Sequence, residues 1–561
     1  MFSRIKSSAG SIKTKDMIEY ILLFIGVVIM FYKSFMGINI GDEVFYLELM
    51  HRFAQGDCPF LHEWHPTQIY AIMLYPLYVL YVFLKGSNNG IILAGRLLMN
   101  SITLLTALII YGILKRGGIS TLERVMITIL QLFYSCNGIL GLSYYMVAYE
   151  ALLLVLALQY YEKQTKHYKY LFIFLKGFFL SLAVCCNPFL SVFLGLKIIW
   201  CLCKGIKSEH MNVVLFLMGI FSSILWIIVV IFSHGGTIKQ FFAVVPELLH
   251  DSSHSVDGNT LATKVYLGLN EYFFFHGYII IGAAILVMIY RVWKKEIGLK
   301  WKRIYFAIQT FYMCMVLGRN IMLSDNLGDA IFIISFYFVL LIPIADITSN
   351  RLWIDVIGAG IILMFSFFLA SNQPRAAGSS GAIIVVIGGA SMFRSVLREI
   401  NIDKKYLALG VAMVMMPVCI VTVYWKVYTN WNDKFSFRLP EKVACGPARG
   451  LYTTEEHKKE VEYMCELAGK MEDEGYLVTN NMLLYLTANL RCGMYSAWYD
   501  GIENQAQRVE QYYSLYPERK PNYIVAYGEG NNFKEFTEWQ EIDAYEKQGE
   551  DMYQIFQRMD L

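Results

Sequence analysis

A series of apolar runs, each close to the length of a membrane-crossing helix, constrains this chain more than any other feature. A helix needs about 20 apolar residues to cross a bilayer, and about thirteen runs reach or approach that length. Hydrophobic residues make up 56% of the chain and charged residues only 17%, which excludes an ordinary soluble protein. The sequence therefore predicts a polytopic α-helical membrane protein. The predicted spans are 17–36, 91–114, 125–142, 145–161, 171–186, 189–203, 211–232, 266–290, 304–322, 330–347, 352–371, 381–397 and 406–428.

Residues 429–561 differ from the 1–428 membrane domain in charge and pattern. Their net charge is roughly −9, whereas the first 428 residues carry about +12. Short apolar segments at 476–479, 494–498 and 522–527 alternate with amphipathic ones at 482–489 and 503–513, which predicts a small α/β domain. Thr453 and Glu456 have capping-box spacing, which predicts a helix from there to about residue 471. No Gly-rich phosphate loop follows a strand, so nucleotide binding has no support.

The charges of the loops predict which side of the membrane each loop faces. The N-terminus and the inner loops carry about 23 Lys and Arg residues, against about 6 in the outer loops. Residues 69–84 are also apolar, but a crossing there would move every later loop to the other side and reverse this bias. We therefore expect 69–84 to lie along the membrane interface. The N-terminus is then cytoplasmic and the C-terminal domain extracytoplasmic, in a bacterial cell membrane. The basic balance belongs to the loops and does not indicate nucleic acid binding.

The first outer loop, residues 37–90, gathers most of the polar residues that suggest chemistry. Asp42 and Glu43 stand where the first span ends. In one interpretation Asp42 is the N-cap of an interface helix over 44–54, and Glu43 complements the helix dipole. In the other, one of the two carboxylates is a general base, because a desolvated carboxylate has a raised pKa. The sequence leaves both interpretations open.

The HEWH stretch of the same loop does not form a recognisable metal motif. His62 and His65 are three residues apart, Glu63 and Trp64 lie between them, and no further ligand stands nearby. We expect His62 or His65 to bind an anionic group, and Trp64 to be a membrane-interface anchor. The sequence offers no support for a divalent metal or another cofactor. The 11 cysteines lie mostly in apolar runs, which favours small core residues over disulfides or metal ligands.

Ionisable residues in or beside predicted spans are functional candidates because burying them is costly. Arg96 stands near the outer end of the second span, Glu150 in the outer half of the fourth, and Arg319 near the outer end of the ninth. We expect these side chains to bind substrate. The structural alternative is pairing, for example of Arg319 with Asp325. The outer segment 233–264 has the length of either a mobile lid or a connector.

Four short motifs follow one another along the first 200 residues: Gly41–Asp42–Glu43, His65–Pro66, Gly95–Arg96–Leu97 and Asn187–Pro188. In this order they resemble the GT-C glycosyltransferases, and among them the branch of protein O-mannosyltransferases and the lipid A aminoarabinose transferase. Thirteen spans with an extracytoplasmic tail also match the layout of the aminoarabinose transferase. The chain departs from the family pattern in three places: Thr67 replaces a second Pro, Asn187–Pro188 stands where the family often has Lys-Pro, and the usual Arg-Tyr…Pro signature is absent before the tenth span.

The resemblance implies an enzyme that transfers a sugar from a polyprenyl-phosphate donor to an envelope lipid, polymer or protein at the outer membrane face. It implies Asp42 as the base, Glu43 as its support, and inversion of the anomeric centre. Arg96, Arg319 and His65 would hold the donor phosphate, since cations stabilise the leaving group.

Two other functions use the same residues. A secondary transporter would line a gate with these outer charges, but paired broken helices and an internal repeat are not evident. A polymerase or ligase of surface polysaccharide is the third possibility, which the position of Asp42 and Glu43 makes less favourable.

Overall fold

The computed structural model describes residues 14–65, 67–205, 210–249, 276–294, 296–323, 327–371, 374–402, 439–471, 475–498, 505–527, 539–547 and 550–558, with a few more between 263 and 270. The predicted thirteenth span, 406–428, lies outside these residues, as does Asp325.

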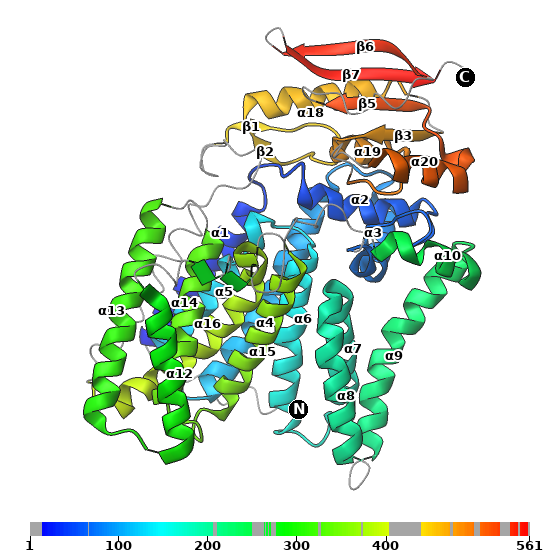
Figure 1. The fold of residues 1–561 in the computed structure, drawn as a ribbon. Helices are drawn as coiled ribbons and strands as arrows, with labels where there is room; N and C mark the ends of the chain where they lie inside the picture. The colour runs from blue at the N-terminus through cyan, green and yellow to red at the C-terminus, as the bar shows by residue number, and fades with distance from the viewer. Residues whose placement is uncertain are drawn as a thin grey trace, which may run out of the picture.

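A bundle of roughly antiparallel helices forms the larger part of the molecule (Figure 1). Among the described residues, seven helices are long and apolar enough to cross a membrane: Gln68–Lys85, Ile91–Arg116, Lys169–Cys186, His210–Ser233, Gly277–Lys294, Arg351–Ala370 and Ala377–Glu399. The bundle contains α1 (Thr14–Lys33), α4 (Ile91–Arg116), α5 (Thr121–Phe133), α6 (Tyr144–Glu162), α7 (Lys169–Cys186), α8 (Ser191–Gly205), α9 (His210–Ser233), α12 (Gly277–Lys294), α13 (Leu299–Leu323), α14 (Leu327–Leu341), α15 (Arg351–Ala370) and α16 (Pro374–Glu399).

The basic loops and the start of α1 lie at one end of this bundle, and the C-terminal domain lies at the other (Figure 1). Contacts at the first end include Arg124 Nη2 with Glu19 Oε1 at 2.9 Å, joining the starts of α5 and α1. Lys302 of α13 pairs with Glu399 of α16 at the same end. The arrangement agrees with the predicted alternation of loops, and the assignment of this end to the cytoplasm stays a prediction.

The predicted third span, 125–142, is wrong at its outer end. Helix α5 ends at Phe133, and residues 134–143 are irregular apart from the short 3₁₀ turn η2 (Cys136–Gly138). Gly138 has φ of 72°, a conformation that a continuing α-helix does not allow. The chain from Tyr134 to Ser143 is therefore a non-helical segment at the end of the bundle nearest the C-terminal domain.

Helices α2 (Asp42–Ala54) and α3 (Gln68–Lys85) lie between the bundle and the C-terminal domain (Figure 1). Although α3 is long and apolar enough to span, both of its ends contact this layer. Gln68 Nε2 donates to Glu63 O at 2.7 Å, and Tyr78 OH donates to Asn88 Oδ1 at 2.6 Å. Asn88 in turn donates to Leu486 O of the C-terminal domain at 3.1 Å. Helix α3 thus contacts the boundary between the bundle and the C-terminal domain, and its position along the membrane interface stays a prediction.

The C-terminal domain is a mixed sheet with helices, as the alternating segments predict. Its five strands have the order β4-β3-β5-β7-β6; β4, β3 and β5 are parallel, and β7 is antiparallel to β5 and β6. The hairpin of β6 and β7 was not predicted, and residues 494–498 are not a strand. The elements are β1 (Glu441–Lys442), β2 (Tyr452–Thr453), α18 (Glu455–Ala468), β3 (Tyr476–Thr479), α19 (Met482–Ala488), β4 (Arg491–Cys492), α20 (Gln505–Leu515), β5 (Tyr523–Tyr527), β6 (Trp539–Lys547) and β7 (Glu550–Arg558).

One further expectation needs correction. The N-cap of α18 is Thr454, whose hydroxyl accepts from His457 N at 3.3 Å, and not Thr453, whose side chain is fully buried. The outer segment 233–264 contains α10 (Ile238–Leu249), and its role as a lid or as a connector stays a prediction.

The segment 441–453 forms backbone hydrogen bonds at the outer ends of two bundle helices, α1 and α4. Tyr452 N donates to Phe35 O and Gly37 N donates to Tyr452 O, both at 2.7 Å, just beyond α1. Gly90 N and Ile92 N donate to carbonyls of 446 and 447 at the start of α4. A disulfide between Cys445 and Cys465 ties this segment to α18. The expectation that the cysteines are core residues rather than disulfides is therefore wrong for these two, which lie in the polar domain.

The disulfide predicts a specific pattern of thiol labelling. In denatured, unreduced protein, a PEG-maleimide should add to the same number of sites in the wild type and in the Cys445→Ser/Cys465→Ser variant. After reduction the wild type should gain two adducts that the variant lacks. Cys492→Ser is the control, since Cys492 is a free thiol and its loss removes one adduct under both conditions. Equal labelling of the wild type before and after reduction would contradict the disulfide.

Candidate active site

The start of α2 places Asp42 and Glu43 differently, although they are neighbours in sequence. Gly41, not Asp42, is the N-cap of α2, so the N-cap interpretation of Asp42 is wrong by one residue. Both carboxylates stand in the first turn, where the helix dipole favours negative charge. Asp42 is partly exposed, whereas Glu43 is 2% exposed. Of the two carboxylates, Asp42 is therefore the one in contact with solvent.

Glu43 forms a buried, two-point ion pair with Arg96 of α4. Arg96 Nε donates to Glu43 Oε1 at 2.8 Å, and Arg96 Nη2 donates to Glu43 Oε2 at 2.6 Å. The third nitrogen, Nη1, donates to the carbonyls of Ser34, Met36 and Gly37 at 3.0–3.1 Å. Arg96 is 0% exposed and all three of its nitrogens are engaged within the protein. Its contacts are those of a positioning residue, and they give no support to phosphate binding.

Gly141 of the irregular 134–143 segment closes the other side of this pair. A Cβ built on Gly141 would lie 2.8 Å from Glu43 Oε1, closer than real Cβ atoms approach. The glycine is therefore needed for close packing and not for a positive φ. The ion pair thus joins the end of α1, the start of α2, α4 and the 134–143 segment.

Tyrosines surround Asp42. Burial first, and then the negative charge of Asp42, raise the pKa of Tyr46 well above its usual value. The Tyr46 ring makes edge contacts with the rings of Tyr70 at 5.7 Å and Tyr144 at 5.4 Å. The charge of Asp42 also acts on Tyr70, Tyr144 and Tyr145. Asp42 therefore stands near a group of packed tyrosine rings contributed by α2, α3 and α6.

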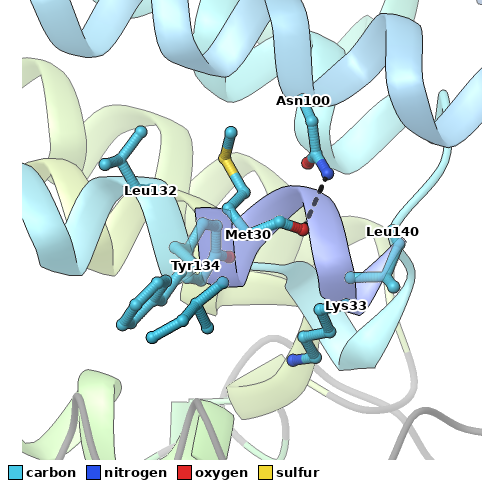
Figure 2. A pocket seen from close by; sticks show the side chains of 8 residues that line it. Met30, Lys33, Asn100, Leu132, Tyr134 and Leu140 are labelled. Carbon is cyan, nitrogen blue, oxygen red and sulfur yellow. Dashed lines mark hydrogen bonds between the residues drawn. The ribbon is translucent and has the colours of Figure 1, made fainter. Parts of the chain in front are cut away.

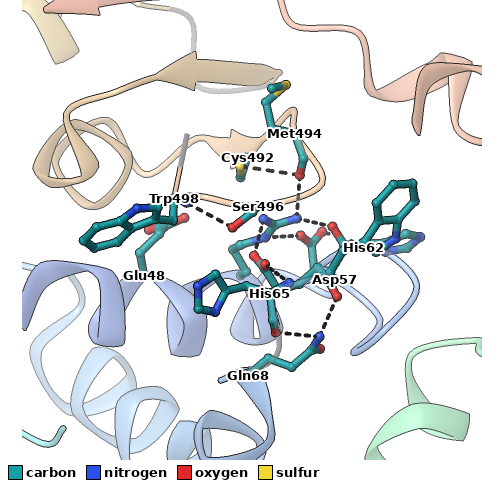
Figure 3. Close-up of polar contacts among 12 residues, drawn as sticks. Glu48, Asp57, His62, His65, Gln68, Cys492, Met494, Ser496 and Trp498 are labelled. Atoms are coloured by element: carbon teal, nitrogen blue, oxygen red, sulfur yellow. Dashed lines mark hydrogen bonds and ion pairs between the residues drawn. The ribbon is translucent and has the colours of Figure 1, made fainter. Parts of the chain in front are cut away.

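A second set of charges, around Arg52, joins the outer loop to the C-terminal domain (Figure 3). Arg52 Nε donates to Asp57 Oδ2 at 2.7 Å and Nη1 donates to Glu63 Oε2 at 2.6 Å. Arg52 Nη2 donates to the carbonyls of His62 and Met494. Arg519 Nη1 donates to Asp57 Oδ1 at 2.8 Å. Two arginines and two carboxylates balance, so the cluster is neutral overall, as burial requires.

His62 belongs to this cluster as a neutral acceptor. Its Nδ1 accepts from Cys58 N at 2.9 Å and from Arg519 Nη2 at 2.8 Å, so Nδ1 cannot carry a proton. Burial and the neighbouring charge of Arg519 lower the pKa of His62 to about 4. The contacts of His62 therefore favour domain docking over the binding of an anionic substrate.

Glu63 and Trp64 also serve the boundary between loop and domain. Glu63 is fully buried and hydrogen-bonds Ser496 and the backbone of Ala497; burial raises its pKa despite these bonds and the charge of Arg52. Trp64 N donates to Tyr495 O at 2.7 Å, and the two rings stack with centroids 5.5 Å apart. Trp64 is 1% exposed, so the prediction of a membrane-interface anchor is wrong.

His65 packs against Phe45, which stands one turn after Asp42 on α2. The centroids of the two rings lie 4.9 Å apart. The Trp498 ring of the C-terminal domain contacts the same Phe45 at 5.3 Å. His65 and Trp498 are partly exposed, like Asp42. The structure thus brings Asp42, His65 and a residue of the C-terminal domain to one place.

The other two predicted binding residues lie in the bundle. Glu150 is 2% exposed and accepts from the hydroxyls of Thr103 at 2.7 Å and Thr106 at 2.5 Å, which fits a structural role within the bundle. Arg319 is half-buried near the end of α13. Its predicted partner, Asp325, lies outside the described residues. Binding of substrate by Arg319 stays a prediction.

A small pocket is lined by Asn100, which stands one turn after Arg96 on α4 (Figure 2). Asn100 Nδ2 donates to Met30 O at 3.3 Å on its wall and to Ser34 Oγ at 2.6 Å beside it. Lys33, 7% exposed, is the charged residue among those that line it. The lining residues are Ile29, Met30, Lys33, Asn100, Leu132, Phe133, Tyr134 and Leu140.

Within the described residues, no group of three or more His, Cys, Asp or Glu side chains is placed to hold a metal ion. Sequence reasoning missed Arg52, Asp57 and Arg519, which form the docking cluster. Arg52 and Asp57 stand in the outer loop, so their proximity to HEWH was available as a signal. Arg519 lies 462 residues from Asp57, and no local sequence pattern predicts that contact.

Two solved structures are similar to this chain. One is an archaeal oligosaccharyltransferase, AglB from Archaeoglobus fulgidus, in complex with an inhibitory peptide and a dolichol-phosphate. It is 12% identical, with a TM-score of 0.42, and the match covers 97% of this chain and 74% of that one. The other is ArnT from Cupriavidus metallidurans in the apo state. It is 12% identical, with a TM-score of 0.36 and coverage of 96% and 97%.

No protein-family model matches the chain. No curated protein matches it in sequence. What the site can do therefore has to be derived from its own side chains.

Breaking the Glu43–Arg96 pair should destabilise the protein strongly. Glu43→Gln leaves Arg96 buried without its countercharge, which costs about 3–5 kcal/mol, and Arg96→Met leaves Glu43 in the same state. The double variant should lose less than the sum of the single losses. Thermal unfolding of the purified protein in detergent measures this. The exposed Glu455–Lys459 pair is the control, and Lys459→Ala should leave the midpoint unchanged. Additive losses at Glu43 and Arg96 would contradict the coupling.

His62 should make stability depend on pH. Its pKa of about 4 in the folded protein is below the usual 6.5, so the unfolded chain binds a proton first as pH falls. The contribution of neutral His62 is complete above pH 6.5 and is lost progressively towards pH 4. His62→Asn keeps an acceptor but does not titrate. Its unfolding midpoint should therefore fall less than that of the wild type between pH 7.5 and pH 5. Parallel profiles for the two proteins would refute this assignment.

Proposed function

We propose that this protein is a membrane glycosyltransferase that transfers a sugar from a polyprenyl-phosphate donor to an acceptor hydroxyl outside the cytoplasmic membrane. One observation carries the proposal: Asp42 is a partly exposed carboxylate beside a buried, fully paired one, where the bundle, the outer loop and the C-terminal domain meet. The motifs around Asp42, His65 and Arg96 resemble those of GT-C glycosyltransferases. The Cys445–Cys465 disulfide supports an extracytoplasmic position for the C-terminal domain, because disulfides persist in oxidising compartments.

In this proposal Asp42 is the general base. It removes the proton from the acceptor hydroxyl as the hydroxyl oxygen attacks the anomeric carbon of the donor, and the bond to the phosphate oxygen breaks. A single displacement of this kind inverts the anomeric centre. Glu43 supports Asp42 indirectly: its pair with Arg96 fixes the first turn of α2, which fixes the direction of the Asp42 side chain.

The leaving phosphate needs a cation, and Arg96 is already engaged with Glu43. We assign this role to Arg319, near the outer end of α13, and to Lys33, which lines the same small pocket as Asn100. Both stand at the end of the bundle where the apolar chain of a lipid donor can enter from the membrane. His65, beside Phe45, contacts the acceptor in this proposal.

The proposal predicts that Asp42→Asn abolishes glycosylation while the protein remains folded in the membrane. Removing a general base lowers rates by typically 10²–10⁴-fold. Envelope glycans of a deletion strain carrying each variant would be compared by mass spectrometry, with protein amounts and unfolding midpoints measured alongside. Asp355→Asn is the matched control, since Asp355 is an exposed carboxylate on α15. Full glycosylation in the Asp42→Asn strain would overturn the proposal.

A further inference from the structure

Two buried hydrogen-bond donors on neighbouring helices lack an acceptor among the described residues. They are the hydroxyl of Tyr70 on α3 and the Nδ2 of Asn187 at the end of α7. Tyr70 is 0% exposed and Asn187 2% exposed. A buried polar group without a partner lowers the stability of the folded protein, so native proteins keep few of them. Two such donors on helices that pack against each other need an explanation.

Tyr70 belongs to the group of tyrosine rings near Asp42. Its ring packs on Tyr46 at 5.7 Å and on Tyr144 at 5.9 Å, and the charge of Asp42 acts on its hydroxyl. Helix α3, which carries Tyr70, is held at its start by Gln68 Nε2 donating to Glu63 O. The phenol is thus fixed in place by contacts that do not involve its oxygen.

Asn187 reaches the same neighbourhood from the end of α7. It follows Cys186 at the end of α7, a helix that packs against α3, which carries Tyr70. The Oδ1 of Asn187 accepts from Phe189 N at 3.1 Å, and this bond fixes the amide at the turn before α8. The bond also settles which amide atom is oxygen, because the partner is a donor. The amide nitrogen is therefore oriented and has two hydrogens to donate.

We infer that Tyr70 and Asn187 donate hydrogen bonds to the hydroxyl oxygens of a sugar residue in the acceptor. This inference rests on the proposed function and narrows it: the acceptor would be a carbohydrate, with its attacking hydroxyl facing Asp42. A carboxylate that accepts and two neutral groups that donate match a sugar ring, whose hydroxyls both donate and accept. The negative faces of the Tyr46 and Tyr144 rings suit its C–H groups.

A phosphate fits this place less well. The nearby carboxylate of Asp42 would repel an oxyanion, and a buried oxyanion calls for a charged donor such as Arg or Lys. Tyr70 and Asn187 are both neutral. Binding of the donor phosphate at this spot is therefore the outcome that a test has to separate from sugar binding.

Removing the two donors should lower activity without lowering stability. Tyr70→Phe deletes only the unpartnered hydroxyl, and Asn187→Ser keeps an oxygen for Phe189 N while removing the amide nitrogen. Each variant should reduce envelope glycosylation about tenfold, with an unchanged or higher unfolding midpoint. Tyr149→Phe is the matched control: Tyr149 is also 0% exposed with an unpartnered hydroxyl, but lies deeper in α6 beside Glu150. It should leave glycosylation unchanged.

A direct binding measurement separates the two ligands. Undecaprenyl phosphate should bind the purified full-length Tyr70→Phe and Asn187→Ser variants as tightly as it binds the wild type. A loss of tenfold or more in that affinity would overturn the sugar assignment. Wild-type glycosylation by both variants would also overturn it. If Asp42→Asn still abolishes glycosylation, only this inference fails; if Asp42→Asn leaves it intact, the proposed function fails first.

Discussion

The ion pair between Glu43 and Arg96 is the constraint on which the outer end of the bundle depends. Arg96 binds the carboxylate with two nitrogens and the carbonyls after α1 with the third. One buried guanidinium therefore sets where the first span ends and where α2 begins. The close approach of Gly141 adds the irregular segment after α5 to the same arrangement. Because such a pair is costly to break once buried, it holds the backbone around Asp42 in one geometry.

The C-terminal domain is attached to that geometry by the docking cluster around Arg52. Its charges balance and its donors are met by carboxylates, carbonyls and the neutral His62. The apolar core continues through the boundary, with Trp64 stacked on Tyr495. The domain therefore borders the candidate site, because its Trp498 contacts Phe45 of α2. A substitution of Arg519, far from Asp42 in sequence, would therefore alter the position of α2 and with it the geometry around Asp42.

Local and periodic features were predictable from the sequence. The apolar runs predicted the helices. The loop charges predicted that 69–84 lies along the membrane interface, because a membrane crossing there would move every later loop to the other side. Asp42 and Glu43 were found as a pair, but their different exposures depend on Arg96, 53 residues away. Arg96 was expected on a phosphate because an arginine near a span is costly to bury; its partner within the protein was not visible. Arg519 and the Cys445–Cys465 disulfide depend on tertiary contacts, which no spacing encodes.

In the proposed mechanism Asp42 is the general base, and the buried Glu43–Arg96 pair holds it in position. The most direct test is a structure of the Asp42→Asn protein with undecaprenyl phosphate, determined by electron cryomicroscopy in a lipid nanodisc. The phosphate should lie at the outer end of the bundle beside Lys33 and Arg319, with the lipid chain running down the bundle. A phosphate bound at the opposite end of the bundle, near Glu19 and Arg124, would contradict this mechanism.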